Sequence, residues 1–237
     1  MTVFKKTLSA LGVCAALLVS AQAIAANEAT LKVTGTIVPA ACTPALSNGG
    51  EVAFGSIATS TINNAPAGNG LVQLGSKDIT FTISCEAAAS VGFKMIDNRS
   101  SSAVALSASN YIVSPFSGGT AANQSYVGFG LGLAPNNAKI GAYSVSIDGG
   151  NVTADGLSTA TVISDDEGRT WRTAGNALQV ADNARIVTVA NTGSSTPKLF
   201  TDASFPLKIS AGVQTASILG SDEIEFDGNA TLSLVYL

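Results

Sequence analysis

Acidic residues near a tryptophan are the part of this sequence that could do chemistry. Asp165, Asp166 and Glu167 are consecutive, and Trp171, the single tryptophan of the chain, follows them. Hydrolysis of a glycoside needs two carboxyl groups placed on either side of the bond, and consecutive residues of one turn need not converge in that way. The chain contains no histidine for general-base or triad chemistry. We therefore expect no enzyme activity and no catalytic residues.

The same stretch, Ser164–Trp171 ("SDDEGRTW"), resembles the Asp-box motif of sialidase-type propellers, Ser-x-Asp-x-Gly-x-Thr-Trp. The motif occurs once, whereas propellers repeat it from blade to blade, and the chain has no internal repeat. Physically the motif is a tight acidic turn in which Gly168 supplies a positive φ and Trp171 pins the turn to its sheet. A structural hairpin turn is the favoured interpretation. The alternative is that Trp171 contacts a glycan or another surface ligand.

The first 25 residues are predicted to be a secretory signal peptide. Lys5 and Lys6 form its positive region, and residues 7–19 form an apolar region of about 13 residues. Cleavage after Ala23 or after Ala25 satisfies the small-x-small rule, and we prefer Ala25. The apolar region is shorter than the roughly 20 residues that span a bilayer as a helix, so we expect export rather than anchoring in the membrane.

Removal of residues 1–25 leaves about 210 residues, which is enough for one domain with one hydrophobic core. The chain is low in charge, with 12% charged residues and a formal net charge of −4, and it has no cluster of Lys or Arg after the leader. Nucleic-acid binding needs grouped cations, so this class of partner is excluded. Ala, Val, Thr, Ser, Gly and Asn are abundant, which is typical of short strands separated by polar turns, and we predict an all-β fold.

Cys42 and Cys85 are the two cysteines that remain after removal of the leader. In an exported protein, an isolated pair of cysteines is most simply a disulfide. A metal site would need further His or Cys ligands, which the sequence lacks, so we expect neither a metal nor another cofactor. By loop-closure entropy, a bridge over about 44 residues would stabilise the fold by roughly 4 kcal/mol.

Two segments in the first part of the chain alternate between apolar and polar side chains, which predicts strands with one exposed face. They are residues 31–39 and residues 77–86, and the second carries Cys85 on its apolar side. The connection between them, residues 59–70, is rich in Asn, Gly and Pro and is predicted to be a surface loop. The middle segment, about residues 98–197, is interpreted as a run of hairpins, with strand candidates at residues 126–134, 142–148, 160–165 and 184–190.

The C-terminal stretch, Ile224–Leu237 ("IEFDGNATLSLVYL"), has the strongest alternation in the chain. Apolar side chains at every second position predict a long amphipathic strand. A terminal strand with an apolar face needs a neighbour on each side, and no residues follow this one in the sequence. We therefore expect another segment to cover its free edge.

Together these features resemble the chaperone–usher fimbrial subunits of Gram-negative bacteria, in a branch longer than the common major subunit. The resemblance rests on the alternating "LKVTGTIVPAAC" that leads to Cys42, on the spacing to Cys85 and on the penultimate Tyr236, and it covers about residues 26–95 and 224–237. It implies an incomplete immunoglobulin-like β-sandwich that lacks its seventh strand and is completed by a donated strand. The middle segment would add extra hairpins.

The resemblance also implies roles for particular residues. Residues 26–38 would be the donor strand and the start of the first strand, and residues 39–237 would be one pilin-like domain in which Cys42 and Cys85 tie the first strand to the second. The donor residues would be Asn27, Ala29, Leu31 and Val33. The acceptor groove, which the chaperone also contacts, would be walled by Ile224, Phe226, Leu232, Leu234 and Tyr236. The family often has Gly at the position of Ile224, whereas this chain has Gly228 nearer the end.

The expected function is therefore a structural subunit of a surface fimbria, which polymerises by donor-strand exchange after chaperone–usher export and contributes to adhesion. Its expected partners are neighbouring fimbrial subunits, a periplasmic chaperone, an outer-membrane usher and a host or surface ligand. Its expected location is the cell surface, reached through the periplasm. The alternative is a secreted β-sandwich module that binds a glycan, or acts on one, through the single Asp-box turn.

Overall fold

A computed structural model describes residues 29–37, 40–220 and 222–237 of the chain. The chain divides into two units, residues 1–38 and residues 39–237. Within the described residues, no helix is long and apolar enough to cross a membrane.

In the first unit, residues 29–37 have no regular secondary structure, and the side chains of Leu31, Val33 and Ile37 are exposed. The strand predicted over residues 31–39 is therefore wrong for the described part of that range in the single chain. The physical reason is that an extended segment becomes a β-strand only when the backbone of a neighbouring strand accepts and donates its hydrogen bonds.

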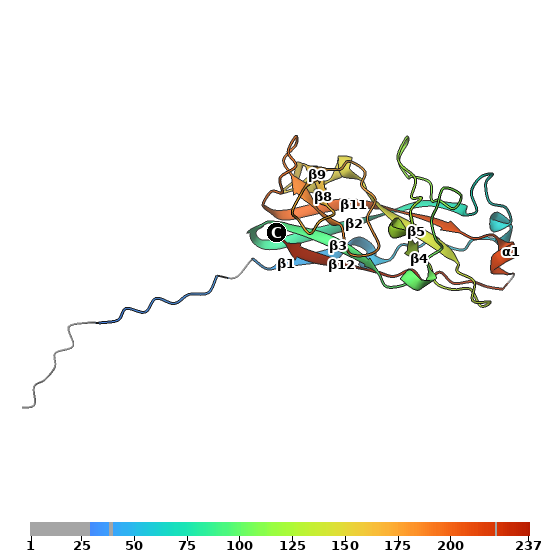
Figure 1. Ribbon diagram of the computed structural model, residues 1–237, viewed down its shortest axis with the longest axis horizontal. Coiled ribbons are helices and arrows are strands. Elements are labelled where there is room, and N and C mark those ends of the chain that lie inside the picture. The colour runs from blue at the N-terminus through green and yellow to red at the C-terminus, as the bar shows by residue number, and fades with distance from the viewer. Residues whose placement is uncertain (1–28, 38–39, 221) are drawn as a thin grey trace, which may run out of the picture. The chain divides into compact units, whose positions relative to one another are not determined.

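The second unit is a sandwich of two antiparallel β-sheets, as predicted (Figure 1). One sheet has the order β1-β2-β11-β5-β4, with the small hairpin β6-β7 attached to β11, and the other has the order β12-β3-β10-β8-β9. The strands of the first sheet are β1 (Cys42–Leu46), β2 (Val72–Ala89), β4 (Phe129–Gly130), β5 (Gly141–Ile147), β6 (Thr153–Ala154), β7 (Leu157–Ser158) and β11 (Phe200–Val213). Those of the second are β3 (Val91–Asp97), β8 (Ala160–Ser164), β9 (Arg172–Thr173), β10 (Ile186–Ala190) and β12 (Ala230–Tyr236). A short helix, α1 (Ala216–Leu219), precedes β12.

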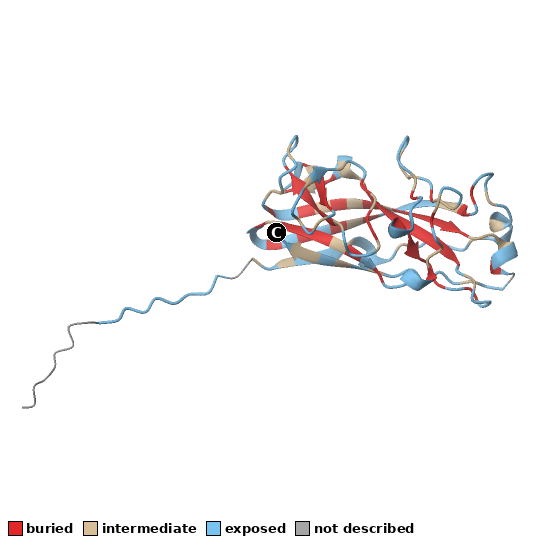
Figure 2. Cartoon of the chain, in the orientation of Figure 1, coloured by how far each residue is buried: buried red, intermediate tan, exposed pale blue. Residues whose placement is uncertain are grey.

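The main hydrophobic core is built from side chains of both sheets, so buried residues run along the strands while the loops are exposed (Figure 2). Phe81 on β2, Phe93 on β3 and Phe205 on β11 are fully buried. The ring centroids of Phe81 and Phe93 are 4.8 Å apart, and those of Phe93 and Phe205 are 5.1 Å apart. Because Phe93 belongs to one sheet and its two partners to the other, this cluster joins the sheets.

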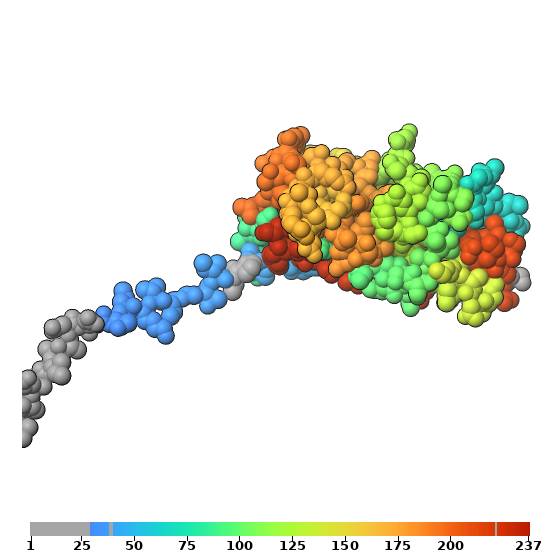
Figure 3. Space-filling view, viewed as in Figure 1, coloured from blue at the N-terminus to red at the C-terminus, as the bar shows by residue number. Residues whose placement is uncertain are grey.

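The middle segment supplies strands to both sheets and does not merely add hairpins to a finished sandwich. The strand candidates at residues 142–148, 160–165 and 184–190 correspond to β5, β8 and β10, which pair within the two sheets. A second small apolar cluster covers β5 on the side opposite the main core; its buried members are Leu71, Leu106, Ile112, Ala122, Val127, Ala142 and Val180. Residues of the middle segment, coloured green to orange, make up most of the surface seen in Figure 3.

The predicted disulfide between Cys42 and Cys85 is confirmed. The two cysteines face each other directly in the antiparallel pairing of β1 and β2. The bridge therefore fixes β1, a strand of five residues at the edge of its sheet, to the much longer β2.

Strand β12 lies at the edge of the second sheet. It pairs with β3 over its full length, and no strand in the described ranges pairs with its other side. In an immunoglobulin-type sandwich, strand F has strand C on one side and strand G on the other. By position, β3 takes the place of C and β12 the place of F, so the place of G is the free edge of β12.

Candidate functional site

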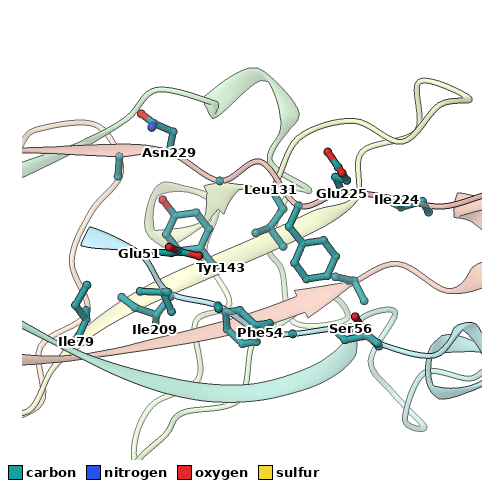
Figure 4. A pocket seen from close by; sticks show the side chains of 18 of the residues that line it. Glu51, Phe54, Ser56, Ile79, Leu131, Tyr143, Ile209, Ile224, Glu225 and Asn229 are labelled. Atoms are coloured by element: carbon teal, nitrogen blue, oxygen red, sulfur yellow. The ribbon is translucent and has the colours of Figure 1, made fainter. Parts of the chain in front are cut away.

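An open groove lies between two irregular segments of the second unit. One segment, residues 50–57, follows β1, and the other, residues 222–229, precedes β12. The groove has a volume of about 980 Å³, and the side chains of its floor come mainly from β2, β5 and β11. Figure 4 shows side chains from both segments and from the floor lining one space, among them Phe54, Ile224 and Ile209.

Most of the side chains that line this groove are apolar. Those of the floor belong to the buried core of the sandwich and include Ile79, Met95, Leu131, Val145, Leu207 and Ile209. Those of the walls, Val52, Phe54 and Ile224 among them, contact the same core but are only partly buried, as is Leu232 of β12. The groove therefore lies directly over the core, and a large hollow with apolar side chains beneath it is a candidate interaction site.

The wall formed by residues 222–229 is held by loops rather than by a strand. The backbone N–H of Asp227 donates to the carbonyl oxygen of Leu131 at 2.9 Å, and the Asp227 carboxylate forms an ion pair with Arg99. The backbone N–H of Asn98 donates to the carbonyl oxygen of Asn229 at 3.0 Å. These contacts tie the segment to loops instead of a sheet, which is why the terminal strand starts at Ala230 and is shorter than the alternation predicts.

Gly228 lies at a close approach of this wall to the groove floor. A Cβ atom at this position would be 2.9 Å from Cε1 of Tyr143 and 3.3 Å from the carbonyl oxygen of Gly130, so a larger residue would displace the wall. The ring of Tyr143 stacks on Phe129, with centroids 5.1 Å apart. Burial, and secondarily the charge of Asp97, raises the pKa of the Tyr143 hydroxyl, so this floor residue stays neutral across the physiological pH range.

Four exposed carboxylates line the groove at its walls, and we call them the acidic rim: Glu51, Asp222, Glu223 and Glu225. None of the described residues that line the groove is a lysine or an arginine. A smaller hollow beside the groove is lined by Glu51 together with Lys77 and Asp78. The groove therefore combines an apolar floor with a negatively charged rim.

The structure places the five predicted acceptor residues in two groups. Ile224, Phe226 and Leu232 line the groove. Leu234 and Tyr236 lie further along β12 and are not part of the groove lining. Leu234 packs against the core, and the hydroxyl of Tyr236 accepts a hydrogen bond from the backbone N–H of Cys42 at 3.0 Å.

The predicted donor residues lie in the first unit. Ala29, Leu31 and Val33 are exposed, and Asn27 lies outside the described residues. Their binding to a groove stays a prediction.

Sequence reasoning missed one wall and most of the floor of the groove. Val52 and Phe54 form the wall that follows β1, and Tyr143 lies on the floor. A signal for the wall was present, because Val52, Phe54 and Ile57 in "EVAFGSI" give a short, partly alternating apolar pattern. No local pattern indicates the floor residues, because they meet the walls only after β5 joins β11.

The Asp-box turn satisfies its own polar groups and connects β8 to β9 as a hairpin. The carboxylate of Asp166 accepts hydrogen bonds from the Thr170 backbone N–H at 2.9 Å, the Thr170 hydroxyl at 2.6 Å and the Ser164 hydroxyl at 2.7 Å. The indole N–H of Trp171 donates to the carbonyl oxygen of Gly168 at 3.0 Å, and Gly168 has a φ of 86°. Every fixed residue of the motif thus has a structural role in the turn.

The three consecutive acids of this turn bind separate partners. Asp165 pairs with Arg185 at 2.6 Å and with Arg172 at 2.9 Å, and Glu167 pairs with Arg169 at 3.4 Å. No group of His, Cys, Asp and Glu within the described ranges is arranged to hold a metal ion. The geometry of the turn therefore favours a structural interpretation over chemistry on a glycan.

The pKa of Asp166 provides a test of this turn. The hydrogen bonds from Thr170, followed by that from Ser164, lower the pKa of Asp166 to about 2. Because the folded-state pKa lies below the unfolded value of about 3.9, the carboxylate stabilises the turn fully above about pH 4 and loses that effect as the pH falls through about 2. We expect Thr170→Ala to raise the pKa of Asp166 toward the ordinary value, as measured by a carboxyl-carbon NMR titration. Thr173→Ala, in β9, is the matched control and should leave the pKa of Asp166 unchanged; equal values in both variants would contradict the assignment.

The sequence is similar over nearly its whole length to two proteins of Escherichia coli strain K12. "Protein GltF" is 38% identical in an alignment 252 positions long, which covers 99% of this chain and 99% of GltF. "Uncharacterized protein YhcF" is 33% identical in an alignment 227 positions long, which covers 91% of this chain and 93% of YhcF. Residues 31–144 match a family described as a protein of unknown function, DUF1120. This match includes Leu31, Val33, both cysteines of the disulfide and Tyr143 of the groove floor.

Proposed function

This chain belongs to the family of GltF and YhcF, and we propose that it is a structural subunit of a surface fimbria that polymerises when a neighbouring subunit donates a strand. The observation that carries the proposal is the open apolar groove next to β12, whose free edge has no partner strand in the described ranges. An added strand would cover both at once, because its backbone would pair with the strand edge and its alternate side chains would fill the groove.

Residues 29–37 have the features that such a strand needs. When this segment is extended, Leu31, Val33 and Ile37 point to the same side, and all three are exposed in the single chain. Nine extended residues span about 30 Å, which is longer than the roughly 23 Å of the seven-residue β12. The segment therefore has both the pattern and the reach to lie along the free edge.

Assembly of this kind joins two different surfaces, the groove of one subunit and residues 29–37 of the next. A contact between unlike surfaces is head to tail and generates an open filament unless the ring closes. Before assembly, a strand of a periplasmic chaperone would occupy the groove, and an outer-membrane usher would bring the subunits to the cell surface. The Cys42–Cys85 disulfide supports passage through an oxidising compartment. Adhesion to a host or other surface would follow from the position of the subunit in the filament.

Two double variants test the head-to-tail arrangement. Leu31→Asp with Val33→Asp places charge on the donor segment and leaves the groove intact, whereas Ile224→Asp with Phe226→Asp places charge in the groove and leaves the segment intact. We expect the parent chain to form concentration-dependent oligomers and each double variant to remain monomeric. An equimolar mixture of the two variants should form one-to-one dimers, because one supplies a groove and the other a segment. Size-exclusion chromatography with light scattering measures these masses.

The matched control changes the other side of the same segment. Thr34→Asn with Thr36→Asn keeps Leu31 and Val33, so this variant should assemble like the parent. A mixture of the two charged variants that stays monomeric would contradict strand donation, and so would normal assembly of the Leu31→Asp, Val33→Asp chain.

A further inference from the structure

We infer that the acidic rim of the groove recognises Lys32 of the incoming segment, so that the groove selects a basic strand from a second copy of this chain. The inference rests on the proposed function and assigns a charge requirement to the same groove. The occupant is residues 29–37 of the second copy, in which Lys32 is the single charged side chain.

The rim carries negative charge that forms no ion pair within the described part of the protein. All four of its carboxylates are exposed, and none of them is within 4.0 Å of a lysine or arginine nitrogen in the described ranges. The nearby Asp227, which does not line the groove, is in contrast paired with Arg99. Three of the rim carboxylates, Asp222, Glu223 and Glu225, lie within four residues of one wall, so their potentials add over the same stretch of the groove.

Lys32 is placed to meet this rim by the alternation of its own segment. Leu31 and Val33 flank it in the sequence, so a strand that directs those two side chains to the apolar floor directs Lys32 away from it. The long apolar stem of a lysine can lie along the edge of the groove while its ammonium group reaches the carboxylates. The "LKV" pattern thus matches the groove on both faces of the incoming strand. Leu31 and Val33 would contact the apolar floor, and Lys32 would face the carboxylates of the rim.

This charge match adds selectivity to an otherwise apolar contact. Apolar side chains fill pockets without strong discrimination among sequences, whereas an acidic strand opposite the rim would place like charges together. Exposed ion pairs are individually weak and are screened by salt. The signature of the inference is therefore a preference for Lys32 that is large at low salt and small at high salt.

The test uses the full-length chain, expressed with its own leader, with Leu31→Asp and Val33→Asp so that its own segment does not compete. Fluorescent peptides of residues 29–37 are titrated with this chain, and binding is measured by anisotropy. The peptides are the native sequence, the Lys32→Glu peptide and a peptide with Leu31→Asp and Val33→Asp. We expect the Lys32→Glu peptide to bind about tenfold more weakly than the native peptide at ~20 mM salt and within about twofold of it at ~1 M salt.

A matched pair of changes in the chain separates the rim from the net negative charge of the protein. Glu223→Gln with Glu225→Gln should reduce the preference for Lys32 at low salt to about twofold or less. Glu86→Gln with Asp202→Asn removes the same charge from exposed positions outside the groove and should leave the preference unchanged.

Equal binding of the native and Lys32→Glu peptides at low salt would overturn the rim inference and leave strand donation standing. A preference for Lys32 that both pairs of changes reduce equally would also overturn it, because the effect would then belong to the whole protein. Failure of the native peptide to bind, or equal binding of the Leu31→Asp, Val33→Asp peptide, would overturn strand donation and the rim inference together.

Discussion

Replacement of Cys42 and Cys85 by serine is expected to lower the free energy of unfolding by about 4 kcal/mol. The disulfide closes a loop with a sequence separation of 43, and loop-closure entropy assigns roughly 4 kcal/mol to a loop of that length. For a domain of this size, that loss corresponds to a melting temperature lower by about 10 °C. In the folded state, the strand that loses its covalent link is β1, a short edge strand bridged to β2 at the start of its pairing.

Urea unfolding of the parent and of the Cys42→Ser, Cys85→Ser variant measures this difference directly. The reduced parent is the control and should unfold at nearly the same urea concentration as the double variant. A difference below about 1 kcal/mol would mean that the unfolded chain gains little freedom from the loss of the bridge, contrary to the loop-closure account.

The Cys42→Ser, Cys85→Ser variant should also change the shape of the groove. Leu46, the last residue of β1, lines the groove, and the wall of residues 50–57 begins after a short 3-10 helix, Ser47–Gly50. With β1 released from β2, this wall would lose its anchor, so the peptide of residues 29–37 should bind more weakly to the reduced protein than to the oxidised one. The disulfide thus connects the stability of the fold to the shape of the proposed acceptor site.

Local sequence patterns predicted strands that have one face buried in the core and the other face exposed. Residues 77–86 alternate because one face of β2 meets the core while the other is exposed, and this part of β2 was predicted correctly. β11 was missed although Ala203, Phe205, Leu207 and Ile209 alternate along its core side; Pro206, on its other face, argues against an inner strand when the sequence is considered alone. In the folded chain, β11 lies between β2 and β5 and forms backbone hydrogen bonds with both.

The candidate site was predicted in part for the same physical reason. Ile224, Phe226 and Leu232 belong to one alternating stretch, so a local pattern was enough to group them. The groove as a whole depends on three stretches that are far apart in the chain, and their meeting is decided by sheet pairing. The acidic rim is an example of this dependence on sheet pairing. Glu51 and Glu225 are far apart in the sequence, yet they line the two walls of one groove.

Substitution of Phe93 by alanine is expected to cost about 4 kcal/mol of unfolding free energy. Phe93 has no exposed surface, and its ring lies against Phe81 and Phe205 across the interface between the sheets. Truncation of a buried phenylalanine to alanine removes its burial and leaves a cavity, which together cost about 3–5 kcal/mol. Loss of the two ring contacts adds to that cost, because aromatic pairs contribute beyond their buried area.

Phe226→Ala is the matched control, since it removes the same atoms from a residue that lines the groove and is 38% exposed. It should cost clearly less stability than Phe93→Ala, because part of the Phe226 side chain is already exposed in the single chain and its removal leaves no closed cavity. Its larger effect should be weaker binding of the peptide of residues 29–37, measured on the same samples that are used for unfolding. Were Phe226→Ala to destabilise the chain as much as Phe93→Ala, the groove would be closed core in solution and no space would remain for a donated strand. A small cost in stability with a clear loss of binding would instead mean that the contacts of Phe226 form mainly between subunits.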